Sequence, residues 1–178
     1  LVLLMDAELY RMDSLHANLV KLGVKGNYNG LTLKSNGQVL VALQQKGVAV
    51  VDPMNGTILD TIHADIANVN FIYETSQNKL LLAGTDEFFL LDDHNNVIAT
   101  KQHSLGAIIG GFFDGQTWFL HGYSDVHRFD SALNYMGVLS KPTNDATIKF
   151  VLPGDTHHWA FGNESFNAFR MALEFEGM

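Results

Sequence analysis

The stretch VAVVDPMNGTILDTI, Val48–Ile62, decides the fold because three similar stretches occur elsewhere in the chain, at 8–23, 88–102 and 126–140. Each consists of an apolar run, an aspartate, a short polar turn and a second run. The aspartates are spaced by 39, 40 and 38 residues; they are Asp13, Asp52, Asp92 and Asp130. A degraded fifth copy carries Met171 in place of the aspartate. The chain is therefore a repeat protein with a period of about 40 residues.

Two further apolar runs precede each aspartate stretch. The nearer run is VLVALQ, KLLLAG, TWFLHG or HHWAFG, and the farther run is LTLKSNG, FIYETSQN, GFFDG or IKFVLPGD. The runs are rich in β-branched and aromatic residues and lack helical periodicity, which is typical of strands. The prolines Pro53, Pro142 and Pro153 all fall at the breaks between runs. One period therefore predicts four antiparallel strands, lettered a to d in chain order.

The aspartate of each copy has a structural explanation. Its carboxylate can accept the backbone N–H two residues further on, which closes an Asx-turn. Asn55-Gly56 follows Asp52, and Asn-Gly pairs favour the positive-φ turns of tight hairpins. We therefore interpret the four aspartates as structural residues of the c–d turns; they are Asp13, Asp52, Asp92 and Asp130.

Four antiparallel strands every ~40 residues predict an all-β fold of the β-propeller class. The expected blades span 26–64, 65–104 and 105–143, flanked by partial blades at 1–25 and 144–178. Partial blades expose apolar faces and strand edges, so we expect a larger propeller, completed by further sequence or by another chain. A five-bladed ring is the alternative.

Two segments resemble known propeller repeats. Val48–Ile62 resembles the YVTN-type repeat, in which an apolar strand, an aspartate and a small turn with glycine precede a further strand. Val126–Leu139, VHRFDSALNYMGVL, resembles an NHL or PQQ-like repeat. The resemblance extends as repeats over nearly the whole chain and implies a β-propeller. It implies no single activity, because such repeats occur in enzymes, sensor ectodomains, assembly scaffolds and adhesion proteins.

The composition excludes several classes of protein. The 178 residues include no cysteine, which excludes disulfides and thiolate metal sites. The net charge of −8, from 11 basic and 19 acidic residues, disfavours a nucleic-acid partner, since phosphate contacts need a basic surface. No apolar run approaches the roughly 20 residues of a membrane-spanning helix. An extracytoplasmic, periplasmic location is the expected one.

Histidine and tryptophan supply the other candidate residues. Among eight histidines, His121 and His127 flank the turn GYSD, and on a hairpin they would lie nearly opposite each other. We therefore consider this pair as candidate ligands of one metal ion, with Asp125 nearby. The alternative is that both are ordinary strand residues. Trp118 and Trp159 occupy equivalent places in strand b, where core packing is expected.

One end of the blades gathers acids and histidines. In a propeller the d–a and b–c loops share one face. The expected binding residues on these loops are His63, Asp65, Asp86, Glu87, His103, Asp125, Asp145 and Glu164. Such a surface attracts cations or a basic partner. The alternative is an acidic rim that only keeps the protein in solution.

We therefore expect a non-catalytic propeller that serves as a protein-interaction or ligand-binding scaffold in an extracytoplasmic sensing or assembly system. The alternative is a propeller enzyme, either a cation-dependent, lactonase-like hydrolase or a quinoprotein-like enzyme. The final strands lack the docking tryptophan of quinoprotein repeats, and the innermost strands lack a recurring acid at their channel-entry ends. We expect no cofactor, with Ca²⁺ or another divalent cation as the alternative, and a protein partner.

Overall fold

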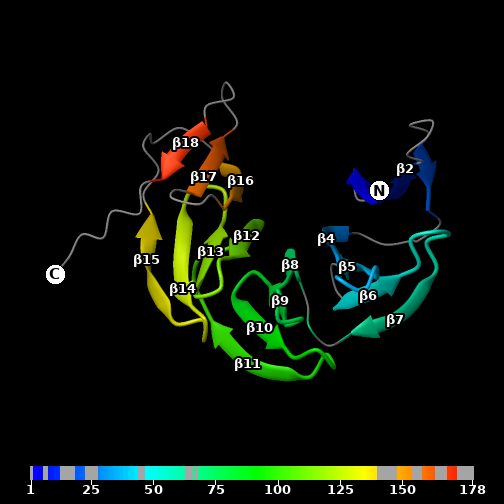
Figure 1. Ribbon diagram of the computed structural model, residues 1–178, viewed down its shortest axis with the longest axis horizontal. Coiled ribbons are helices and arrows are strands. Elements are labelled where there is room, and N and C mark those ends of the chain that lie inside the picture. The colour runs from blue at the N-terminus through cyan, green and yellow to red at the C-terminus, as the bar shows by residue number, and fades with distance from the viewer. Residues whose placement is uncertain are drawn as a thin grey trace. The chain divides into compact units, whose positions relative to one another are not determined.

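The computed structural model describes residues 2–5, 8–12, 19–22, 28–43, 47–62, 66, 68–139, 148–153, 158–162 and 168–171. Within these ranges every regular element is a β-strand (Figure 1). None of them contains a helix that is long and apolar enough to cross a membrane. The chain forms two compact units, Leu1–Ala107 and Ile108–Met178.

The first unit contains three antiparallel sheets in which strands follow one another in chain order. A three-stranded sheet comprises β1 (Val2–Met5), β2 (Glu8–Met12) and β3 (Leu19–Lys21). The next sheet comprises β4 (Tyr28–Leu33), β5 (Val39–Leu43), β6 (Val48–Val51) and β7 (Ile58–Ile62). The third comprises β8 (Phe71–Glu74), β9 (Leu80–Ala83), β10 (Glu87–Leu91) and β11 (Val97–Gln102).

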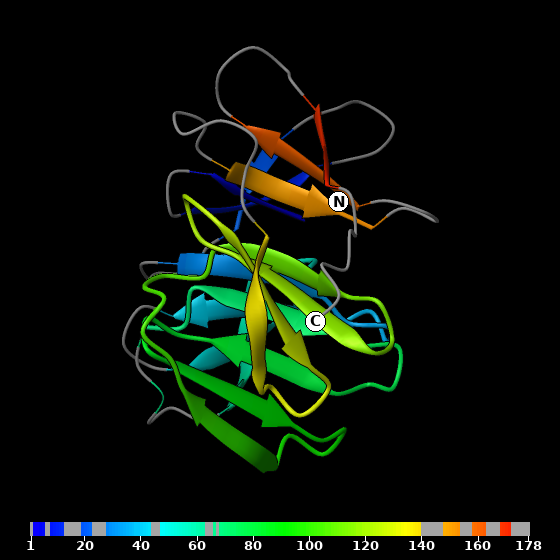
Figure 2. The same ribbon diagram turned by 90° about the vertical axis from the view of Figure 1, so that its left-hand side faces the viewer.

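The second unit repeats the same up-and-down pattern. Its four-stranded sheet, coloured lime to yellow in Figure 2, comprises β12 (Gly110–Phe113), β13 (Thr117–His121), β14 (Val126–Asp130) and β15 (Tyr135–Leu139). A three-stranded sheet comprises β16 (Ile148–Leu152), β17 (His158–Gly162) and β18 (Ala168–Met171). The expected all-β class and the four-stranded antiparallel blades are confirmed.

Burial explains why the central strands are continuously apolar. All four residues of β6 and all four of β9 are buried. Successive side chains of a strand point to opposite faces. In β5 and β6, one set packs with Leu9 of the preceding sheet, and the alternate set packs with Ile72 and Leu82 of the following sheet. A sheet covered on both faces needs apolar residues at every position of its middle strands.

The fourth strand of each full sheet has a different character. Most of its large apolar side chains are 39–61% exposed, although Ile62 at the end of β7 is buried; the exposed ones are Ile58 and Leu59 in β7, Val97 and Ile98 in β11, and Tyr135, Met136 and Val138 in β15. These strands each form one edge of their sheet, and the exposed side chains distinguish this edge from the first strand at the other edge. In the first unit, the core therefore lies between the first three strands of neighbouring sheets.

Candidate functional site

The described aspartates of the repeat close the turns between the third and fourth strands. Oδ1 of Asp52, Asp92 and Asp130 accepts the backbone N–H two residues further on, at 2.8, 2.9 and 2.9 Å respectively. This is the hydrogen bond that defines an Asx-turn. The first aspartate of the series, Asp13, lies outside the described residues.

Two of these turns carry the same additional hydrogen bonds. Oδ1 of Asp92 also accepts the backbone N–H of Asn96 at 2.8 Å, and Oδ2 accepts the Asn96 side-chain amide at 3.0 Å. Asp130 makes both bonds with Asn134, each at 2.8 Å. Hydrogen bonding from Asn96, through its side chain first and then its backbone, lowers the pKa of Asp92 below its usual 3.8.

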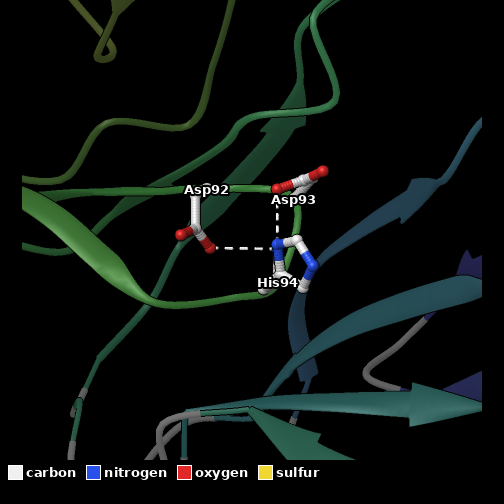
Figure 3. A group of neighbouring side chains, drawn as sticks. All are labelled: Asp92, Asp93 and His94. Carbon is white, nitrogen blue, oxygen red and sulfur yellow. Dashed lines mark hydrogen bonds and ion pairs between the residues drawn. The ribbon is translucent and has the colours of Figure 1, made fainter.

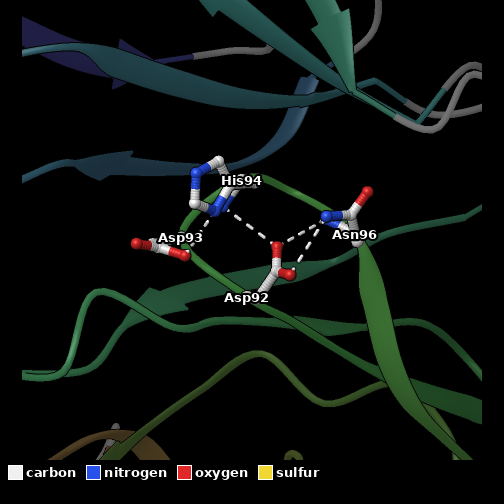
Figure 4. Close-up of polar contacts among 4 residues, drawn as sticks. All are labelled: Asp92, Asp93, His94 and Asn96. Atoms are coloured by element: carbon white, nitrogen blue, oxygen red, sulfur yellow. Dashed lines mark hydrogen bonds and ion pairs between the residues drawn. The ribbon is translucent and has the colours of Figure 1, made fainter.

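The Asp92 turn also contains a group that resembles a metal site. Ligand atoms of Asp92, Asp93 and His94 lie within 4.8 Å of one another (Figure 3), which no other three such residues achieve in the described ranges. Nδ1 of His94 lies 2.8 Å from Oδ1 of Asp93, and both side chains are largely exposed. Figure 4 shows, however, that both carboxylate oxygens of Asp92 already accept hydrogen bonds within the turn.

Comparison with the turn at Asp130 shows why Asp92, Asp93 and His94 lie close together. It has the same carboxylate hydrogen bonds, yet Ser131 and Ala132 stand where the other turn has Asp93 and His94. The shared feature is therefore the structural aspartate, and the acid and histidine beside Asp92 are exposed side chains of a turn.

Replacing Asp130 with alanine should lower the free energy of unfolding by about 1–2 kcal/mol. The carboxylate accepts three hydrogen bonds, and each contributes about 0.5–1.5 kcal/mol net, although not additively. Urea unfolding followed by circular dichroism measures the loss. Ser131→Ala is the control, because Ser131 is exposed and lies in the same turn. Equal midpoints for the two variants would contradict the structural role of the aspartate.

The pair His121 and His127 does not form a metal site. The register of β13 and β14 pairs His121 with Val126, and Leu120 with His127. Directly paired residues share a face of the sheet, so the two histidines point to opposite faces. His121 is completely buried, whereas His127 is half-buried. The expectation of one metal ion held by both is therefore wrong.

The structure brings together part of the expected binding face in the first unit. The carbonyl oxygen of Asp86, in the b–c loop, accepts the backbone N–H of His103 at the start of the d–a loop at 2.7 Å. Oε1 of Glu87 accepts a hydrogen bond from the side-chain amide of Gln102. The His103 ring stacks on Phe88, with 4.1 Å between centroids. Asp86, Glu87 and His103 therefore meet at the open end of the β10–β11 hairpin, with Glu87 on one face of the sheet and the His103 ring on the other, against Phe88; this end of the sheet is here called the Asp86 surface.

The other expected face residues are separate from this group or undescribed. Asp125 lies in the β13–β14 loop of the second unit, where it raises the pKa of His127 against the stronger, lowering effect of burial. The remaining four lie outside the described residues; they are His63, Asp65, Asp145 and Glu164.

Tyr123, in the same loop as Asp125, was not among the residues expected at a binding face. Its side chain is 59% exposed. A large aromatic residue exposed in a short polar loop is a common feature of interaction surfaces, because it offers much contact area with few rotatable bonds. The signal in the sequence was the aromatic residue within the polar turn GYSD.

Comparison with known proteins supports the fold and leaves the activity open. No protein-family model and no curated protein matches the chain. Among solved structures it is similar to a streptogramin B lyase structure, with a TM-score of 0.69 and 11% identity over 98% of this chain and 68% of that one. It is also similar to the computationally designed Ika4 protein, with a TM-score of 0.60 and 10% identity over 84% of this chain and 94% of that one.

The streptogramin B lyase has a propeller-type fold, and the sheets described above have the same four-stranded antiparallel form. The chain is therefore a protein of the β-propeller class. Since 655 chains of known structure match, the similarity identifies a widely used architecture. At such low identity it does not specify the chemistry carried out on that architecture.

Proposed function

We propose that this chain is a non-catalytic interaction module that binds a positively charged segment of a partner protein through the Asp86 surface. The observation that carries the proposal is the hydrogen bond between the Asp86 carbonyl and the His103 N–H, at 2.7 Å. It joins the b–c loop to the start of the d–a loop, so that the two loops lie side by side at this end of the sheet, where one basic segment can reach Asp86 and Glu87.

The side chains of the Asp86 surface have the chemistry for this role. Asp86 is exposed, and Glu87 and His103 are partly exposed. Stacking on the fully buried Phe88 holds the His103 ring in place, and Glu87 is oriented by Gln102. Oriented side chains lose less conformational entropy when a partner binds. A protein with a net charge of −8 also attracts basic partners over a distance.

The equivalent loop of the next full blade supports the same reading. There the b–c loop, residues 122–125, presents the exposed Tyr123 beside the partly exposed Asp125. Within the second unit by itself, an exposed tyrosine beside an acidic residue offers a basic segment both aromatic contact and negative charge.

The alternative, a cation-dependent enzyme, has less support among the described residues. Asp92 belongs to the acid–histidine group that is compact enough for a metal ion in the described ranges, but its carboxylate accepts hydrogen bonds within its own turn. A Ca²⁺ titration by calorimetry tests this alternative directly. Binding of the ion with a defined stoichiometry would favour the enzyme or a cation-dependent scaffold.

The proposal predicts that removing the two charges of the Asp86 surface weakens binding of a short oligolysine peptide. In the double variant Asp86→Asn/Glu87→Gln, we expect the dissociation constant to rise about three- to tenfold at low salt, since each exposed charge pair contributes about 0.2–1 kcal/mol. The loss should shrink as salt increases. Glutamine at 87 keeps an oxygen for the Gln102 amide, so the β10–β11 pairing is preserved.

A matched control separates a local surface from overall charge. Asp60→Asn/Asp93→Asn also removes two negative charges, but from exposed positions on β7 and in the β10–β11 turn. We expect this variant to bind the peptide almost as tightly as the unmodified protein. Equal weakening in both double variants would mean that only net charge matters, and no binding by the unmodified protein would overturn the proposal.

A further inference from the structure

His121, the last residue of β13, is the most deeply buried titratable side chain among the described residues, with 0% exposure. On its face of the sheet it is paired with Gly110 of β12 and Val126 of β14. A Cβ atom added to Gly110 would lie 2.3 Å from Nε2 of His121. The imidazole ring therefore lies directly against the main chain of Gly110.

The hydrogen bonds of the ring define its tautomer. Nδ1 lies 3.0 Å from the carbonyl oxygen of Gly122, and a carbonyl can only accept, so Nδ1 carries the proton. Nε2 is buried and has no hydrogen-bond partner in the described part of the chain. Burial lowers the pKa of His121, and the bond to Gly122 offsets only part of this effect. The ring is therefore neutral at pH 7.

The loop that follows His121 connects two sheets of the second unit. The carbonyl of His121 accepts the N–H of Ile109 at 2.9 Å. Two residues later, the carbonyl of Tyr123 accepts the N–H of Ile148, the first residue of β16, also at 2.9 Å. Loop 122–125 therefore follows directly on the buried His121 ring, receives the ring's hydrogen bond at Gly122 and holds the start of β16 through Tyr123.

We propose that His121 makes loop 122–125 an acid-sensitive latch on the sheet β16–β18. Protonating Nε2 would place an N–H and a positive charge against Gly110, where no described group accepts them. The ring therefore takes up a proton only by leaving its position. When it leaves, the hydrogen bond from Ile109 to the His121 carbonyl and the one from Ile148 to the Tyr123 carbonyl are released together.

No described charged group around His121 compensates for the cost of protonating Nε2 in its buried position. Gly110 and Val126 flank the ring, and the next residue of β14 on the same face is Arg128, which is not an acid that could pair with a protonated ring. His127 titrates on the opposite face, where Asp125 is its acidic neighbour. The first residue of β16, Ile148, is apolar and adds no charge near His121; the side chain of Lys149 lies outside the described part of the chain.

Hydrogen exchange measured by NMR between about pH 7.5 and about pH 5 tests the latch. In the opened state His121 has an ordinary pKa of about 6.5, so below that pH the opening equilibrium should rise about tenfold per pH unit. After correction for intrinsic exchange, protection of the Ile109 and Ile148 amides should fall accordingly. The Asn70 amide, which donates to Ala83 in the first unit, is the internal reference and should keep its protection.

Two variants test whether His121 causes the pH-dependent loss of protection at Ile148. His121→Gln cannot titrate but keeps an amide that can donate to Gly122, so the pH dependence at Ile148 should disappear. His94→Gln removes a histidine that is 79% exposed and should leave the pH dependence intact. The proposal would be overturned if the protection of the Ile148 amide still depended on pH in His121→Gln, or if it did not depend on pH in the unmodified protein.

A measurement on the unmodified protein covers the case in which His121→Gln does not fold. Nitrogen-detected NMR of the histidine rings should show His121 as the Nδ1–H tautomer, without titration, down to the pH at which Ile148 loses protection. An ordinary titration of His121 near pH 6.5 with Ile148 still protected would also refute the proposal.

Discussion

Replacing Gly111 with alanine is expected to destabilise the second unit by about 3–5 kcal/mol, combining a steric clash with backbone strain. A Cβ at this position would lie 2.3 Å from the carbonyl oxygen of Phe119 and 2.8 Å from Cδ2 of Leu120. Gly111 pairs with Leu120 across β12 and β13, so the obstructing atoms belong to the neighbouring strand and cannot move aside alone. Its φ of +155° adds to the cost for any residue with a side chain.

Urea unfolding followed by tryptophan fluorescence and circular dichroism measures this loss. Gly115→Ala is the matched control in the β12–β13 turn. Gly115 has a φ of +105°, but a Cβ there meets nothing within 4 Å, so only the conformational cost of about 1 kcal/mol applies. The difference between the variants isolates the clash. If both lost the same stability, the close approach of β12 and β13 at Gly111 would be disproved.

Replacing Trp118 with alanine is expected to cost about 3–5 kcal/mol, the usual range for a large buried aromatic side chain. Trp118 is 1% exposed and stands between Phe113 of β12 and Phe129 of β14 in the register of the sheet. Its ring centroid lies 4.6 Å from that of Phe113. Alanine would leave a cavity between three strands, which neighbouring residues can fill only partly.

Trp118→Phe is the graded comparison. Phenylalanine keeps an aromatic ring against Phe113, so the loss should be less than half that of alanine. The same urea unfolding measured by circular dichroism serves for both variants, because fluorescence changes with the tryptophan itself. Loss of less than about 1 kcal/mol in Trp118→Ala would mean that this side chain is not part of the core.

Local chemistry made much of the fold predictable. The continuously apolar segments 48–51 and 88–91 predicted strands, and all of their residues except the partly buried Phe89 are buried. The Asx-turns were equally predictable, because the carboxylate of Asp92 needs only the N–H two residues away. Neither inference depends on which sheets are neighbours.

The candidate site depended on contacts that no local pattern contains. Asp86 and His103 meet through a backbone hydrogen bond between residues on either side of the β10–β11 hairpin. The histidines beside the GYSD turn could be expected on one hairpin. Whether they faced each other depended on the register of β13 and β14, which a count along the sequence does not contain.

By itself, the sequence determined the repeat, the strand class and the role of the turn aspartates, because each follows from side chains within a few residues of one another. Only the tertiary structure decided that His121 is buried against Gly110 while His127 points to the other face. The physical reason is the two-residue period of a β-strand: a shift of one residue in pairing moves every side chain to the opposite side of the sheet.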